Sequence, residues 1–196
     1  MFATLLSLAA LGITVTPEAP SHSAQRIAQA DDPCQNTSAV SPSESLRQLE
    51  LEQFGIAVMI PENYRAILFN NGTVRIVDPG TYNLFRCRAI GGNPLGRGFT
   101  DLLIRSEPMP ANQSLEAIVQ ETIVNDRYCT SSYSMDNQDG LLVQSCSSVR
   151  FSDTHAEFWV QSPVTDDIIV IETTCDCPGM ADYLTEVLEQ TTFLSE

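Results

Sequence analysis

All six cysteines of this chain follow an N-terminal segment that has the pattern of an export signal. An even number of cysteines in an exported chain predicts a framework of disulfide bonds, because compartments outside the cytosol are oxidising. We therefore expect a disulfide-stabilised domain. The number of cysteines alone leaves the pairing open. The six residues are Cys34, Cys87, Cys129, Cys146, Cys175 and Cys177.

The N-terminal segment predicts a signal peptide over residues 1–30. Leu5–Val15 is an apolar run, too short to span a bilayer, which needs about 20 apolar residues. Ala28-Gln29-Ala30 then provides a cleavage site of the A-x-A type, although no Lys or Arg precedes the apolar run. No later stretch approaches the length of a membrane span. We expect the mature protein to be secreted, periplasmic or lumenal.

The mature chain divides by composition into two parts. Residues 31–53 are mostly polar and predict a flexible N-terminal segment, with a short helix that Ser43 caps and that runs through Leu51. Residues 54–196 have the length and apolar content of one domain.

The later segments predict strands and helices in an order typical of an α+β fold. Asn70-Asn71-Gly72 indicates a tight hairpin turn, and the apolar spacing after Ser114 indicates a helix. We expect an antiparallel β-sheet with helices packed on it. The expected strands are 54–60, 64–69, 73–77, 82–90, 99–105, 128–133, 141–149, 156–161 and 168–174, and the expected helices are 114–123 and 178–193.

A hairpin centred near Asn137 and Gln138 would set Cys129 opposite Cys146, close enough for a disulfide. We therefore predict the bond Cys129–Cys146. The two cysteines nearest the N-terminus are then left to pair with the two nearest the C-terminus, in an order that the sequence leaves open. The first two are Cys34 and Cys87, and the last two are Cys175 and Cys177.

The order of elements resembles that of the PsbP-like superfamily, named for an extrinsic protein of photosystem II. The resembling features are the strand from Phe54 to Pro61 with Tyr64 after it, the helix that begins at Ser114, and the closing helix that ends in Phe193. The resemblance covers residues 54–194. It implies an antiparallel sheet sandwiched by helices and a binding or assembly role without a catalytic site. The six cysteines and the absence of Lys depart from that family.

Charge restricts the partner. The net charge is −15, and every cation except the histidines is an Arg. Nucleic acid and anionic lipid are therefore disfavoured, because both need clustered cations. Within an expected strand, Arg86 and Arg88 would share one face, opposite Cys87. With Arg97 and Arg105 they predict a binding surface for an anion or an acidic partner, or else ion pairs with the acidic C-terminal half of the same chain.

The sequence offers one thiol-redox alternative. Cys175-Asp176-Cys177 precedes a helix, whose N-terminus lowers the pKa of a thiol. Asp176 opposes formation of a thiolate there. Two cysteines two residues apart in a strand also suit structural bonds to other elements. We favour structural disulfides and keep a thiol-disulfide oxidoreductase as an alternative.

Other chemistry has little support in the sequence. His155 is the only histidine after residue 30, no serine-nucleophile motif is present, and we expect an exposed loop histidine. A zinc site is disfavoured. A calcium-binding envelope protein is the third alternative, with acids in turns as ligands. We expect no catalytic residue, cofactor or metal ligand, and the leading hypothesis is an exported, non-enzymatic binding or accessory domain for an unknown protein or small ligand. The turn acids are Asp136, Asp139, Asp166 and Asp167.

Overall fold

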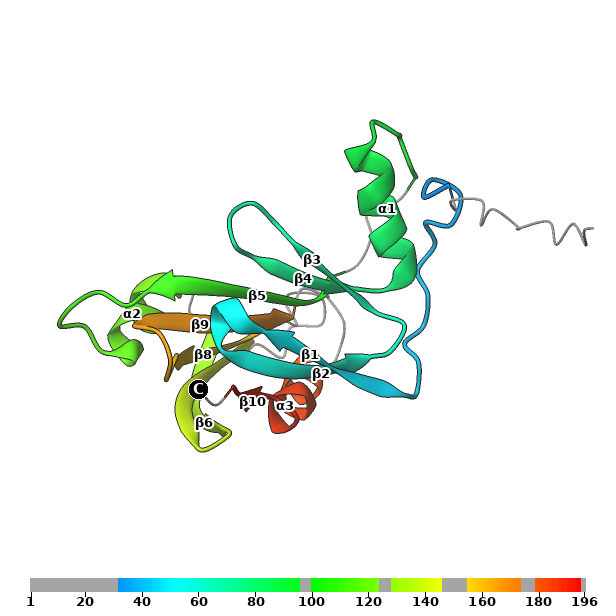
Figure 1. The fold of residues 1–196 in the computed structure, drawn as a ribbon. Coiled ribbons are helices and arrows are strands. Elements are labelled where there is room, and N and C mark those ends of the chain that lie inside the picture. The colour runs from blue at the N-terminus through cyan, green and yellow to red at the C-terminus, as the bar shows by residue number, and fades with distance from the viewer. Residues whose placement is uncertain (1–31, 96–99, 124–127, 146–154, 174–178, 195–196) are drawn as a thin grey trace, which may run out of the picture. The chain divides into compact units, whose positions relative to one another are not determined.

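The computed structural model describes residues 32–95, 100–123, 128–145, 155–173 and 179–194 (Figure 1). The described strands form a seven-stranded antiparallel sheet in the order β3-β4-β5-β9-β8-β7-β6 and a three-stranded sheet in the order β1-β2-β10. The expected α+β class with an antiparallel sheet is confirmed. The elements are β1 (Leu46–Leu51), a 3-10 turn (Glu52–Phe54), β2 (Ile56–Pro61), β3 (Arg65–Leu68), β4 (Val74–Val77), α1 (Pro79–Ala89), β5 (Thr100–Pro108), α2 (Leu115–Thr122), β6 (Tyr128–Met135), β7 (Gln138–Ser145), β8 (Ala156–Gln161), β9 (Asp167–Thr173), α3 (Met180–Glu189) and β10 (Thr192–Phe193).

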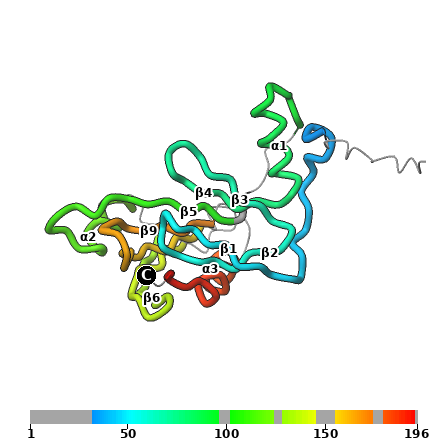
Figure 2. Tube along the Cα trace, in the orientation of Figure 1, coloured from blue at the N-terminus to red at the C-terminus, as the bar shows by residue number. Residues whose placement is uncertain are grey.

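The seven-stranded sheet is covered differently on its two faces. Strand side chains alternate between the faces, so Phe158 of β8 packs in the core with α3 and the small sheet, whereas its neighbour Trp159 packs against α2. The first core is the larger one and buries most of the apolar side chains. The second core, on the face that packs against α2, is small, so α2 covers only part of that face of the sheet. In Figure 2, α1 stands beside β3 and β4, while α2 lies toward the far end of β5.

The turn of the β6–β7 hairpin lies one residue earlier than expected. Met135 pairs with Gln138, so the turn residues are Asp136 and Asn137, with φ of 49° and 65°. Asp and Asn tolerate this left-handed region, which a two-residue turn of this kind requires at both positions. Cys129 consequently lies opposite Gln144, and the placement of Cys129 opposite Cys146 is wrong.

The strand expected over residues 82–90 is wrong, because this segment belongs to α1. Asp78 precedes the helix and its buried carboxylate accepts hydrogen bonds from the backbone N–H groups of Gly80 and Thr81. Pro79 occupies the first turn, where its fixed φ suits a helix and its missing N–H costs nothing. These local start signals outweigh the strand propensity of the aromatic residues that follow.

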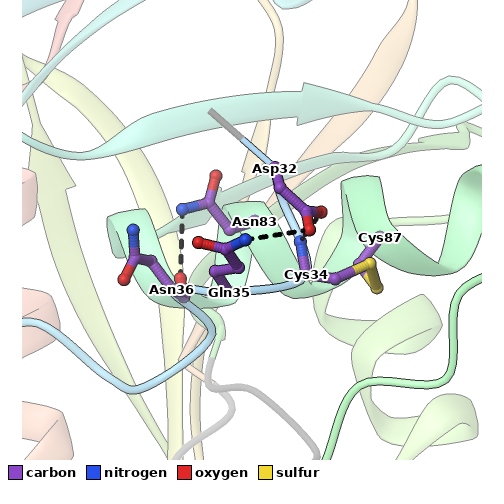
Figure 3. The surroundings of a disulfide bond; sticks show 6 residues. All are labelled: Asp32, Cys34, Gln35, Asn36, Asn83 and Cys87. Atoms are coloured by element: carbon purple, nitrogen blue, oxygen red, sulfur yellow. Dashed lines mark hydrogen bonds between the residues drawn. A yellow bond between two sulfur atoms is a disulfide. The ribbon is translucent and has the colours of Figure 1, made fainter. Parts of the chain in front are cut away.

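The segment before β1 is attached to α1. A disulfide joins Cys34 to Cys87, and the Asn83 side chain donates a hydrogen bond to the Asn36 carbonyl (Figure 3). The Cα atoms of the two cysteines are 4.9 Å apart. The expectation that Cys34 and Cys87 pair with the two cysteines nearest the C-terminus is therefore wrong. That expectation followed by elimination from the predicted bond Cys129–Cys146, and the position of Cys87 on a helix was not foreseen.

The structure corrects two further expectations about local structure. The short helix from Ser43 through Leu51 is wrong, since Leu46–Leu51 forms β1 and pairs along its whole length with β2. The closing helix is shorter than expected, because α3 ends at Glu189 and the chain then pairs with β2 as β10. No helix among the described residues is long and apolar enough to cross a membrane.

We predict that replacing both Cys34 and Cys87 by Ser lowers the free energy of unfolding by about 2–4 kcal/mol, because the disulfide restricts a long loop in the unfolded chain. The bond spans 53 residues. Urea unfolding of the oxidised double variant and of the wild type measures the difference. An unchanged midpoint would show that this bond does not stabilise the domain.

Candidate functional site

One row of side chains crosses the face of the large sheet that α2 leaves partly uncovered. In each antiparallel pair, directly opposed residues point to the same face. Arg75 of β4 lies opposite Leu103 of β5, Leu103 lies opposite Glu172 of β9, and Glu172 lies opposite Glu157 of β8. The pairing of strands thus places a cation, an apolar side chain and two carboxylates in sequence across the sheet.

Arg105 of β5 joins this row to the neighbouring one. Its guanidinium forms a close ion pair with Glu107 and lies 3.9 Å from Oε1 of Glu157 and 3.7 Å from Oε2 of Glu172. The guanidinium carbon also lies 5.3 Å from the centre of the Trp159 ring, within the range of a cation–π contact. Arg105 is therefore shared among three carboxylates and one indole.

His155, just before β8, completes the polar network. Its Nε2 lies 2.7 Å from Oε1 of Glu157, and its Nδ1 lies 3.7 Å from Oε1 of Glu172. The side chain is only 27% exposed, so the expectation of an exposed loop histidine is wrong. The hydrogen bond with Glu157 raises the pKa of His155, burial opposes this, and the charges of both glutamates raise the pKa further.

The two glutamates respond to this environment in opposite directions. Burial raises the pKa of Glu157, but hydrogen bonds with His155 and from the Trp159 indole N–H, at 2.6 Å, outweigh it and leave the pKa below its ordinary value. Burial raises the pKa of Glu172, and the nearby Glu157 charge adds to this. Glu172 is therefore less well compensated than Glu157.

His155, Glu157 and Glu172 each offer one atom to a common point, and these three donor atoms lie within 4.8 Å of one another. A nitrogen and two carboxylate oxygens form a set that divalent cations accept. The guanidinium of Arg105 already lies against both glutamates and supplies positive charge there. A cation at this point would compete with Arg105 and with the proton shared by His155 and Glu157.

A groove with a volume of about 920 Å³ lies between α1 and the uncovered part of the sheet. Three arginines from three elements line it, together with two phenylalanines and Glu172. The apolar side chains of β3 and Leu103 complete its surface. The lining residues are Ile67, Leu68, Phe69, Asn70, Asn71, Thr73, Arg75, Phe85, Arg88, Ala89, Leu103, Arg105 and Glu172.

Arg75 lies against two aromatic rings of the groove, and part of its guanidinium is buried. Its guanidinium carbon lies 5.0 Å from the ring centre of Phe69 and 5.9 Å from that of Phe85. The two rings also contact each other edge to face. The Nε atom of Arg75 is buried and has no hydrogen-bond partner among the described residues. A buried donor of this kind is costly unless an acceptor reaches it.

Of the four arginines that the sequence predicts as one surface, the structure describes three and does not bring them all together. Arg88 and Arg105 line the groove, whereas Arg86 lies over the ring of Tyr82, 5.8 Å from its centre, and outside the lining. Arg97 lies outside the described residues. The expectation that Arg86 and Arg88 share one face is wrong, because residues two apart on a helix point in different directions.

Sequence reasoning did not find Arg75, Glu157 and Glu172. One signal was present: in β8 and β9 a single Glu stands among apolar residues at the spacing that puts it on one face. The pairing between strands, which brings Glu157 and Glu172 together, was not visible in the sequence.

The other predicted residues are only partly described. Cys129 is disulfide-bonded, and since Cys34 pairs with Cys87, its partner is outside the described residues. The bond Cys129–Cys146 therefore stays a prediction. Cys175 and Cys177 also lie outside the described part of the chain.

The turn acids proposed as calcium ligands lie in separate hairpins. Asp136 and Asp139 belong to the β6–β7 hairpin, whereas Asp166 lies in the β8–β9 turn and Asp167 is the first residue of β9. The Asp136 carboxylate accepts a hydrogen bond from the backbone N–H of Phe193, so it links the hairpin to β10.

The fold and the site together define an α+β domain with a groove rich in arginine and aromatic residues beside an ion-pair network. No protein-family model matches the sequence, and no curated protein matches it. Among solved structures, the chain resembles the cyanobacterial PsbP (CyanoP) of Synechocystis sp. PCC 6803. The identity is 10%, the TM-score is 0.45, and the match covers 82% of this chain and 99% of that one. The likeness agrees with the weak PsbP-like resemblance of the sequence and concerns the fold alone.

We predict that Glu157→Gln lowers the pKa of His155. Because that pKa is raised in the folded protein, the stabilisation from the pair is fully present below about pH 6.5 and is lost as the pH rises through the folded value. Urea unfolding measures the free energy of unfolding of both proteins. The difference between wild type and variant should be larger at pH 5 to 6.5 than at pH 9. A difference independent of pH, or a His155 NMR titration identical in both proteins, would contradict this.

Proposed function

We propose that this chain is an exported, non-enzymatic binding or accessory domain whose ligand occupies the groove between α1 and the sheet. The supporting observation is the concentration of arginines at one place on a very acidic protein. The chain has a net charge of −15, yet Arg75, Arg88 and Arg105 all line this groove.

The chemistry of the lining favours a ligand with an anionic group. Arginine binds carboxylate, sulfonate and phosphate groups through several N–H donors, and such charge-assisted hydrogen bonds are stronger than neutral ones. Arg105 is largely compensated by glutamates, so Arg75, whose buried Nε has no hydrogen-bond partner among the described residues, marks the anion-binding end, and Arg88 lines the groove with it. The rings of Phe69 and Phe85 offer apolar surface next to this end.

A binding role also fits how the polar side chains are used. His155 and Glu157 are hydrogen-bonded to each other, and Glu157 also accepts a hydrogen bond from the indole N–H of Trp159. Side chains that are hydrogen-bonded to one another in this way fix the position of the residues beside a binding site. Export, from the signal peptide expected over residues 1–30, would bring the domain to a ligand outside the cytosol.

We predict that Arg88→Glu weakens binding of 8-anilinonaphthalene-1-sulfonate, an aromatic anion, by about tenfold or more, because the variant replaces an attraction by a repulsion. Arg86→Glu is the matched control. It makes the same change of charge on the same helix, but Arg86 does not line the groove. Fluorescence titration of the dye measures both affinities.

The comparison of the two variants decides the proposal. If Arg86→Glu weakens binding as much as Arg88→Glu, the dye responds only to the overall charge, and the groove is not the site. If neither variant changes the affinity, the groove does not bind the anion. Equal thermal midpoints for the two variants exclude a difference in folding.

A further inference from the structure

We infer that the ligand of the groove is a zwitterion, with an anionic group at Arg75 and Arg88 and a cationic amino group at Glu172. This inference rests on the proposed function, since it concerns the same groove. It adds a second charged end to the ligand and so restricts its chemical class to amino-carboxylates and compounds with the same pair of charges.

The register of the sheet sets the spacing of the two ends. Arg75 lies opposite Leu103, and Leu103 lies opposite Glu172, so the three residues cross three adjacent strands on one face. Two strand spacings separate the Cα atoms of Arg75 and Glu172, which is about 10 Å. Leu103 lies between them and offers apolar surface to the middle of a ligand.

The end at Arg75 requires an acceptor. The buried Nε of Arg75 has no hydrogen-bond partner among the described residues, and its guanidinium lies against two phenylalanine rings that offer no acceptor. A carboxylate that reaches into the groove would satisfy this donor. Arg88 lines the same space from α1 and adds a second positive charge.

The end at Glu172 requires a cation. Three carboxylates, of Glu107, Glu157 and Glu172, surround Arg105, and within the described part of the chain His155 is the other basic group in contact with them. Even with His155 protonated, these five described side chains together keep one negative charge in excess. Glu172 is the only one of the three glutamates that lines the groove, so an amino group of a ligand would meet the excess charge there.

The two ends also discriminate against other ligands. A simple anion long enough to fill the groove would place its uncharged tail against Glu172 and would leave that carboxylate without added compensation. A simple cation would meet Arg75 and Arg88. Binding selectivity arises from such unfavourable pairings as much as from attraction.

Three probes test this inference by displacement of 8-anilinonaphthalene-1-sulfonate from the wild-type protein. They are 6-aminohexanoate, hexanoate and hexylammonium, which share an aliphatic chain and differ in their charged ends. We expect 6-aminohexanoate to displace the dye at a concentration at least about tenfold lower than hexanoate, and hexylammonium to be the weakest.

The variant Glu172→Gln identifies the cationic end. It keeps the shape of the side chain and removes its charge, so 6-aminohexanoate should lose its advantage and approach hexanoate to within about twofold. The affinity of this variant for the dye itself shows that the groove is intact. Glu116→Gln, on the exposed surface of α2, is the matched control and should leave the advantage of 6-aminohexanoate unchanged.

Each outcome has a defined meaning. Displacement by hexanoate as strong as by 6-aminohexanoate overturns the zwitterion and leaves the groove as an anion site. Failure of all three probes to displace a dye whose binding depends on Arg88 also overturns the zwitterion. Dye binding that does not depend on Arg88 is a different result, because it removes the proposed function itself.

Discussion

The antiparallel pairing of β9 with β5 and β8 is the constraint on which the site depends. It sets Glu172 between Leu103 and Glu157, and the alternation along each strand keeps these three side chains on one face. A shift of one residue in either pairing would turn Glu172 into the large core against α3. The apolar residues Ile169 and Ile171, which fill that core, therefore fix the position of the charged residue on the opposite face.

The ion-pair network follows from this placement. Among the described residues, the guanidinium of Arg105 lies against three carboxylates and His155 lies against two of them, and burial prevents water from screening these charges fully. The opposite pKa shifts of Glu157 and Glu172 arise because only Glu157 receives two hydrogen bonds from neighbours. Glu157 is thus held by two hydrogen bonds, and Glu172, which lines the groove, is the less compensated of the two.

The sequence was sufficient to predict the fold class and most of the strands, because β-branched runs broken by turn residues carry strong local signals. It failed where two local signals competed. The aromatic residues after Pro79 favour a strand, but the cap at Asp78 decides for a helix. The site was harder, since its residues come from β4, β5, β8, β9 and α1, and no local pattern reports which strands become neighbours.

Because a helix takes the place of the expected strand, its two arginines lie in different surroundings. As part of α1, Arg88 reaches the groove while Arg86 stacks on Tyr82 and stays outside it. The disulfide to Cys34 is formed by Cys87, the residue between these two arginines. A covalent bond at this point holds the helix that forms one wall of the groove. Since a preorganised wall lowers the entropic cost of binding, the disulfide would contribute to the proposed recognition as well as to the predicted stabilisation.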